Sequence, residues 1–195
     1  MSSKTGPNNP FHNLVNDPIA GTFLQLIIHL GQYRYAMEQL RSADILQDRY
    51  AYGFYSDAML RRIGDWFAQP PKMKESQIDY ALRKVGIRDQ DIKPVGSLLD
   101  SAIGKTTWRR LTKYYRNAAS SHEIFELDAQ RKVCVKHGIS LELFSFEFVP
   151  FIDSMSDHVE VLQSHVENKF HSFDQDLYTQ LKQSGIFKSI EGGRN

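Results

Sequence analysis

The sequence predicts a mainly α-helical domain with one small β-hairpin. Apolar residues recur at spacings of three and four through most of the chain, as at Phe23, Ile27 and Leu30. One stretch, 131–148, instead places apolar residues at every second position, which is typical of strands. With 195 residues, of which 41% are hydrophobic, the chain can bury a substantial core in one domain.

Breakers and capping residues set the expected helix boundaries. Asp17 suits a helix cap, and Pro18 suits the first turn that follows it. Pro70 and Pro71 end the second helix, because proline has no N–H to continue the hydrogen-bond ladder. Ser76 caps the third. The expected helices cover about 17–40, 44–67, 76–85, 94–103, 107–125, 154–170 and 174–183.

The hairpin is expected over 131–148, where His137 and Gly138 form a plausible turn and Pro150 ends the second strand. The polar segments at 1–10 and 191–195 are expected to be flexible tails. The segment between them, 11–190, is then a single helical domain that includes the hairpin.

Charge and cysteine content limit the function classes. The formal net charge is only +1, so attraction to a polyanion needs a local patch. Cys134 is the one cysteine, which excludes an intrachain disulfide and suits a reducing compartment. The most apolar stretch, Ile19 to Leu30, is too short to span a bilayer, and 1–10 lacks the apolar run of a secretory signal. We therefore expect a cytoplasmic protein without a membrane partner.

The segment 105–116 is strongly basic, with five cations and no acid. On a helical wheel four of the five fall within about 80° of one another and form a ridge. Closely spaced cations suit a phosphate backbone, because they release its counterions on binding. The alternative to a phosphate-binding ridge is a solvent-exposed basic face whose charge is balanced by acidic residues of other helices. The four cations of the ridge are Lys105, Arg109, Lys113 and Arg116. The residues assigned to RNA binding are Lys105, Arg109, Arg110 and Lys113.

The opposite side of the same helix is apolar. Trp108, Leu111, Tyr115, Ala118 and Ala119 fall on that side and are expected to face the core. The helix would therefore pack on one face and present positive charge on the other.

A short motif follows the ridge, with Arg116, Asn117 and, after four further residues, His122. An arginine, a polar residue and then a histidine after a gap of four to six resembles the signature of the HEPN superfamily. The resemblance covers roughly residues 18–125 as a helical bundle with the motif in its last helix. In the toxin subgroup that works beside a nucleotidyltransferase antitoxin, a tyrosine stands two places after the histidine. Here that residue is Ile124, so the chain is more similar to the defence and abortive-infection type.

The resemblance implies a metal-independent endoribonuclease, or an RNA-binding relative, in a defence or toxin–antitoxin type system. Arg116 would stabilise charge on the phosphorus in the transition state, Asn117 would orient a phosphate oxygen or the histidine, and His122 would move a proton. The resemblance also implies a homodimer in which two motifs form one composite site. RNA, a second copy of the chain and a neutralising or regulatory protein are the expected partners. No cofactor and no metal are expected.

Two questions stay open from the residues alone. On an unbroken helix His122 lies roughly 240° from Arg116. Either His122 is a core or interface histidine, or the helix loosens at Ser120 and Ser121 and re-aims it. The alternative function is a non-catalytic helical interaction module or adaptor, with the ridge as plain surface and His122 packed.

Other reactive residue types have structural interpretations. His29 lies among apolar residues and is expected to be buried and hydrogen-bonded. Asp57 is expected to form a local ion pair with a nearby arginine. Cys134 is expected to be structural. His158 and His165 are two helical turns apart, too far to share one metal ion without a third element.

Overall fold

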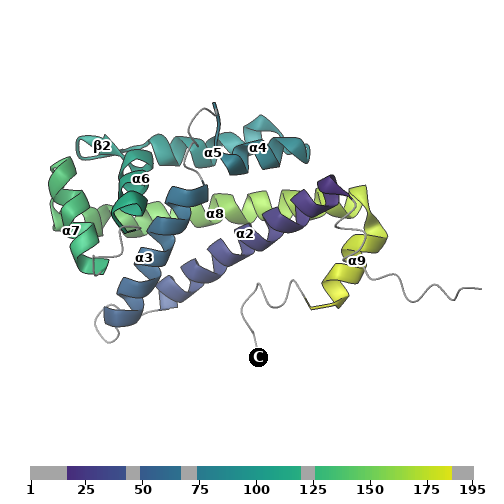
Figure 1. Ribbon diagram of the computed structural model, residues 1–195, viewed down its shortest axis with the longest axis horizontal. Coiled ribbons are helices and arrows are strands. Elements are labelled where there is room, and N and C mark those ends of the chain that lie inside the picture. Colours follow the sequence, from purple (N-terminus) through teal and green to yellow (C-terminus); the bar gives the residue numbers. More distant parts are fainter. Residues whose placement is uncertain (1–16, 43–48, 67–73, 120–125, 186–195) are drawn as a thin grey trace, which may run out of the picture.

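The computed structural model describes residues 17–42, 49–66, 74–119 and 126–185. This part of the chain holds eight α-helices and one two-stranded sheet, so the predicted mainly α-helical fold with a small hairpin is confirmed (Figure 1). The elements are α2 (Pro18–Ser42), α3 (Arg49–Trp66), α4 (Gln77–Lys84), α5 (Asp89–Asp100), β1 (Ala102–Ile103), β2 (Thr106–Thr107), α6 (Trp108–Ala119), α7 (Glu126–His137), α8 (Leu141–Phe173) and α9 (Gln175–Gln183). The predicted tails, 1–10 and 191–195, lie outside the described residues.

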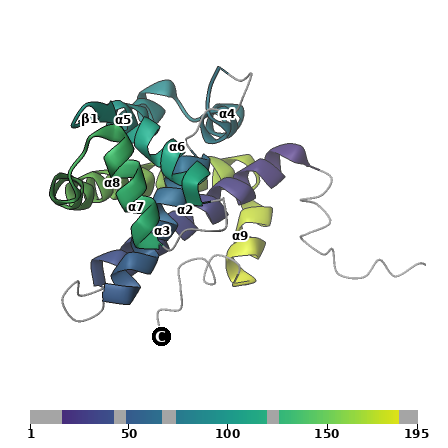
Figure 2. The same cartoon turned by 60° about the vertical axis from the view of Figure 1, so that its left-hand side comes forward.

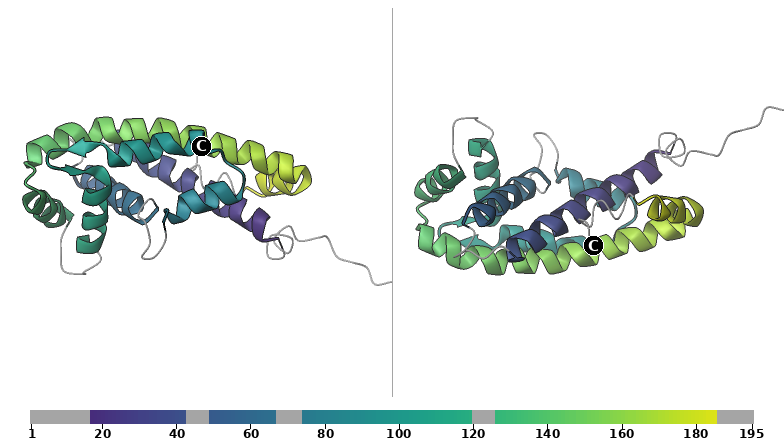
Figure 3. Two further views of the ribbon diagram at one scale, coloured as in Figure 1. Left: turned by 90° about the horizontal axis from the view of Figure 1, so that it is seen from above. Right: turned by 90° about the horizontal axis from the view of Figure 1, so that it is seen from below.

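Helix α8 is the spine of the fold. Its 33 residues correspond to about 50 Å, and it runs along one edge of the molecule with α9 folded back at its end (Figure 3). Helix α2 packs obliquely along it, and the rings of Phe23 and Phe170 stack with centroids 5.0 Å apart. Arg41 Nε lies 2.7 Å from Asp153 Oδ1 and joins the same two helices at the surface.

The remaining helices divide between two regions beside α8. Helices α4 and α5 lie together on one side, whereas α3, α6 and α7 gather near the N-terminal end of α8 (Figure 1). Trp108, the first residue of α6, stacks on Phe151 of α8 with centroids 4.1 Å apart. This contact places α6 against the spine.

The hairpin predicted over 131–148 is wrong, because this stretch forms α7 and the start of α8. Residues two apart share a face in a strand but not in a helix. Val133 is 2% exposed while Val135 is 71% exposed, and Phe146 is 77% exposed between buried Phe144 and Phe148. The burial therefore follows the helical period, and the alternation of apolar residues misled the sequence interpretation.

The turn expected at His137 and Gly138 exists, but it ends a helix. Gly138 has a φ of 63°, and the Ile139 amide donates to the Cys134 carbonyl at 2.9 Å, as in a helix C-terminus closed by glycine. Ser140 then caps α8 by accepting from the Leu143 amide. Pro150 lies inside α8 on its exposed side rather than ending an element.

The actual hairpin lies just before α6. β1 and β2 pair antiparallel, with Ala102 opposite Thr107 and Ile103 opposite Thr106, around a turn at 104–105. The helix predicted for 94–103 is therefore placed too late, because α5 is Asp89–Asp100 and Ile103 belongs to a strand. The motif helix predicted for about 107–125 is described as Trp108–Ala119, and 120–125 lies outside the described residues.

Two predicted helix starts are confirmed by their hydrogen bonds. The carboxylate of Asp17 accepts from the amides of Ile19 and Ala20 at the start of α2. The hydroxyl of Ser76 accepts from the Asp79 amide at the start of α4. Among the described helices, none has both the length and the apolar character needed to cross a bilayer.

Candidate functional site

The apolar side of α6 faces the core, as the sequence predicts. Trp108, Leu111 and Tyr115 are buried. Thr112 is also buried, and its hydroxyl donates to the Trp108 carbonyl at 2.9 Å. The side chains of Ala118 and Ala119 lie outside the described residues. The burial of these side chains therefore fixes which side of α6 faces the core.

Helices α3 and α6 cross at Gly64. A Cβ at Gly64 would lie 2.8 Å from the Thr112 carbonyl oxygen and 3.0 Å from Arg116 Cβ, so a larger residue does not fit. Nearby, the Tyr115 hydroxyl donates to the buried carboxylate of Asp57. Arg61 Nε lies 2.6 Å from the other Asp57 oxygen, which confirms the predicted local ion pair.

The structure brings Arg116 and Asn117 together at the end of α6. Arg116 Nη1 donates to the Gly64 carbonyl at 3.4 Å, and its Nε and Nη2 both donate to Asn117 Oδ1 at 3.3 Å. The Arg116 side chain is half-buried and Asn117 is exposed. His122, the third predicted catalytic residue, lies outside the described residues.

The predicted cationic ridge does not lie on one helix. Lys105 is in the hairpin turn before α6, so helical spacing does not apply to it. Arg109 forms a two-pronged ion pair with Asp100 of α5, with nitrogen–oxygen distances of 2.7 and 3.2 Å. The alternative of a basic face balanced by acids thus holds for Arg109. Lys105 and Lys113 are exposed.

Helices α6 and α7 pack against each other (Figure 2), and contacts between basic and aromatic side chains join them. Lys136 Nζ lies 3.8 Å from the centre of the Tyr114 ring, and the His137 ring meets the same tyrosine edge-on with centroids 5.1 Å apart. Burial, followed by the charges of Lys136 and Arg110, lowers the pKa of His137. We call Arg110, Tyr114, Lys136 and His137 the α6–α7 cluster.

Sequence reasoning included Arg110 but missed the other members of the α6–α7 cluster. The reason is the strand interpretation of 131–148, which separated Lys136 and His137 from the motif helix. The spacing of Lys132 and Lys136, four residues apart, was the available signal that this segment is helical with a basic face.

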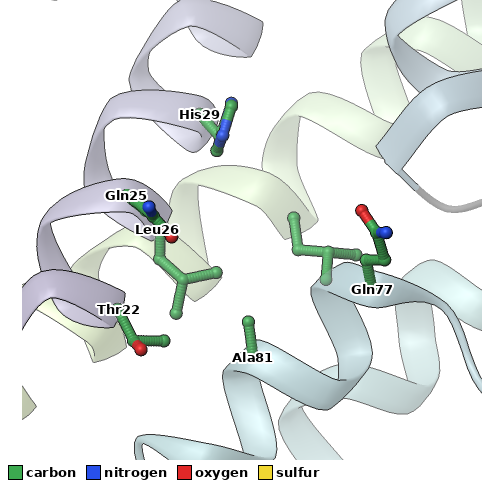
Figure 4. A pocket seen from close by; sticks show the side chains of 7 residues that line it. Thr22, Gln25, Leu26, His29, Gln77 and Ala81 are labelled. Carbon is green, nitrogen blue, oxygen red and sulfur yellow. The ribbon is translucent and has the colours of Figure 1, made fainter. Parts of the chain in front are cut away.

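A pocket of about 250 Å³ separates α2 from α4 (Figure 4). His29 is exposed at this pocket, so the expectation of a buried histidine is wrong. Partial burial, followed by the charge of Arg62, lowers its pKa. The lining mixes amide, hydroxyl and apolar side chains and comprises Thr22, Gln25, Leu26, His29, Gln77, Ile78 and Ala81.

The surroundings of His165 and Cys134 indicate structural roles. His165 Nδ1 lies 3.5 Å from Asp91 Oδ2, which links α8 to α5. Cys134 is buried, and burial raises the pKa of its thiol, as expected for a structural cysteine. Within the described ranges, no group of three or more histidine, cysteine or acidic side chains could hold a metal ion.

Comparison with protein-family models, curated proteins and solved structures finds no match to this chain.

Proposed function

We propose that this protein is a HEPN-like, metal-independent endoribonuclease, or an RNA-binding relative of one. The arrangement at the end of α6 carries the proposal: the Gly64 carbonyl and the Asn117 amide oxygen both accept hydrogen bonds from Arg116. A guanidinium positioned in this way can bind phosphate oxygens and stabilise the charge that develops on them.

Two exposed cations of α6, Arg110 and Lys113, extend this positive surface toward the start of the helix. Within the part of the chain that the structure describes, no carboxylate forms an ion pair with either side chain. Both side chains could therefore bind a phosphate backbone and displace its counterions without first breaking an ion pair. This supports RNA as the substrate class in a protein whose net charge is only +1.

The proposed reaction needs two proton transfers and no metal. A histidine takes the proton from the RNA 2′-hydroxyl, whose oxygen then attacks the neighbouring phosphorus. The bond from phosphorus to the 5′-oxygen breaks, and an acid protonates that oxygen. The products carry a 2′,3′-cyclic phosphate and a 5′-hydroxyl. We assign the proton transfers to His122 and the stabilisation of the phosphorane to Arg116, with Asn117 positioning the guanidinium.

We further propose that the protein works as a homodimer, so that the second copy supplies the second histidine. The motif resemblance supports a role in a cytoplasmic defence or toxin–antitoxin type system, where a neutralising or regulatory protein would bind the dimer. Light scattering of the purified chain tests the dimer directly: a single protomer mass at micromolar concentration contradicts the composite site.

Cleavage of a structured RNA in the presence of EDTA tests the activity. We expect the intact chain to cut and both Arg116→Ala and His122→Ala to lose at least about a hundredfold in rate, since each removes a main catalytic contribution. Lys182→Ala, on distant α9, is the control and should cut normally. Circular dichroism checks that the variants stay folded. Equal cleavage by all four proteins would show that the activity comes from a contaminant or from other residues.

A non-catalytic interaction module is the second candidate, and exposed apolar side chains favour it. Val135 and Phe146 are 71% and 77% exposed on α7 and α8. Single exposed apolar residues are common, but the exposed fractions of these two side chains are high for large apolar residues. If the intact chain neither cuts nor binds RNA, this candidate replaces the first.

A further inference from the structure

The α6–α7 cluster has the chemistry of a site for one unstacked nucleotide. Arg110 and Tyr114 are four residues apart on α6 and so share a face, while Lys136 and His137 come from the end of α7. Figure 2 shows the two helices side by side in front of α3. The cluster therefore draws on two elements that pack against each other, not on one helix surface.

Tyr114 is the centre of the cluster. It is half-buried, and the His137 ring meets it edge-on at an interplanar angle of 84°. The histidine thereby supports the tyrosine ring from α7. The ammonium of Lys136 lies over the ring at 3.8 Å, and Lys136 itself is exposed. A long, exposed lysine can swing aside, so a flat ligand can take its place on the ring.

The charges around Tyr114 are positive. Arg110 and Lys136 are both exposed, and among the described residues neither forms an ion pair with a carboxylate. Both charges act at the same place, since both lower the pKa of His137. An aromatic ring flanked by unpaired cations is the combination that binds single-stranded nucleic acid, with the base on the ring and the phosphates on the cations.

We propose that Arg110, Tyr114 and Lys136 form a nucleotide-binding subsite for single-stranded RNA. Tyr114 stacks against one base, and Arg110 and Lys136 bind the adjoining phosphates. The inference rests on the proposed function and adds the path of the substrate. Arg110, Tyr114 and Asn117 occupy one face of α6, and seven residues of helix span about 10 Å. A strand held at Tyr114 thus reaches Asn117, whose amide oxygen accepts from Arg116, within a few nucleotides.

Single-stranded RNA is favoured over a duplex for a physical reason. A base in a duplex has both faces covered by its neighbours, so an aromatic side chain stacks only on bases that are unpaired or turned out. A surface that recognised only a duplex backbone would bind it through the cations, and Tyr114 would stack on no base.

Binding of an RNA that cannot be cut tests the subsite separately from catalysis. The probe is a fluorescein-labelled single strand of about ten nucleotides, a length in the range of single-strand sites. It is methylated on every 2′-oxygen and is titrated in EDTA by fluorescence anisotropy. The variants are Tyr114→Leu, Lys136→Gln and Arg110→Gln. Tyr80→Leu and Lys182→Gln are matched controls, because Tyr80 is an exposed tyrosine of α4 and Lys182 lies over the Tyr178 ring of α9.

We expect Tyr114→Leu to weaken binding about tenfold, which corresponds to about 1.4 kcal/mol. Tyr114→Phe keeps a stacking ring and should bind within about twofold of the intact chain. Lys136→Gln and Arg110→Gln should each weaken binding and flatten its salt dependence, while the two controls change neither. Circular dichroism and thermal unfolding show whether Tyr114→Leu remains folded, and Tyr114→Phe carries the test if it does not.

The outcomes separate the two proposals. If the intact chain does not bind the probe at all, both the proposed function and the subsite fail. If it binds and the three cluster variants bind equally well, only the subsite fails. If the cation variants lose affinity but Tyr114→Leu does not, the surface recognises charge alone and the nucleotide subsite is overturned. Competition with inorganic polyphosphate separates recognition of charge from stacking of a base, because polyphosphate has no base. Tyr114→Leu should therefore leave polyphosphate binding unchanged.

Discussion

The hydroxyl of Tyr115 donates a hydrogen bond to the carboxylate of Asp57, and this buried contact fixes the motif helix α6 to α3. Arg61 pairs with the same carboxylate from the next turn of α3. The adjacent residue, Arg116, reaches the Gly64 carbonyl across the same helix crossing. The position of the proposed catalytic arginine thus depends on the packing of α3 against α6.

Removing the Tyr115 hydroxyl should destabilise the protein. In Tyr115→Phe, Asp57 loses a buried hydrogen bond, which typically costs about 1–3 kcal/mol. Urea unfolding followed by circular dichroism measures the change. Tyr80→Phe, at an exposed tyrosine of α4, is the matched control and should shift stability by less than about 0.5 kcal/mol. Equal effects at the two positions would contradict a stabilising role for the Tyr115–Asp57 contact.

The close crossing at Gly64 should not tolerate a methyl group. Gly64→Ala places Cβ against the backbone of Thr112, so the two helices must move apart at a cost of about 1–3 kcal/mol. Gly96→Ala in α5 has its nearest neighbour, Arg109 Nη2, at 3.9 Å. That substitution should stabilise by about 0.5–1 kcal/mol, because alanine favours helix over glycine. Thermal unfolding of both variants compares them, and a stabilising Gly64→Ala would refute the crossing geometry.

The ion pair between Arg109 and Asp100 should weaken the proposed RNA binding. In Asp100→Asn the guanidinium loses the charge of the Asp100 carboxylate, so more of its positive charge can attract phosphate. We expect tighter RNA binding and a salt dependence steeper by about 0.7, the contribution of one phosphate contact in a single strand. Asp153→Asn is the matched control, because it breaks the surface pair with Arg41 away from α6. If the control strengthens binding equally, the gain reflects net charge alone.

The pKa of His137 should make stability fall in mild acid. Its Nε2 is buried without a hydrogen-bond partner among the described residues, and burial with the charges of Lys136 and Arg110 lowers its pKa from the ordinary 6.5. The unfolded chain therefore takes up a proton at higher pH than the folded chain does. Stability from this group is complete above about pH 6.5 and is lost as pH falls toward the lowered folded value.

Thermal unfolding between about pH 7.5 and 5 measures this effect. We expect His137→Gln to lose less stability over that range than the intact chain does. His29, whose pKa is also lowered, leaves a remaining dependence of the same sign. His158→Gln on α8 controls for simple removal of a histidine. An unchanged pH profile in His137→Gln would contradict the assignment.

The sequence predicted features that depend on near neighbours. Asp17 and Ser76 cap helices as expected, because each bonds amides two or three residues away. The apolar side of α6 was also predictable, since its period is set by the helix alone. The hairpin at 131–148 was not, because spacings of two and of three to four coexist there, and only packing against the core selects between them.

The site was predictable only in part for a similar reason. Helical spacing predicted that Arg109 and Arg116 share a face, which is a local property. It could not predict that Asp100 pairs with Arg109, or that Gly64 accepts from Arg116, because these partners come from other helices. The meeting of Tyr114 with Lys136 and His137 likewise requires the packing of α7 on α6.

Cleavage through the RNA 2′-hydroxyl is the central claim, and product analysis tests it most directly. The intact chain is incubated in EDTA with an RNA and with the same sequence made as DNA, and the product ends are identified by mass spectrometry. We predict that only the RNA is cut, that its products end in a 2′,3′-cyclic phosphate and a 5′-hydroxyl, and that His122→Ala abolishes both. An RNA left intact, or products ending in a 3′-hydroxyl and a 5′-phosphate, would contradict the proposed mechanism.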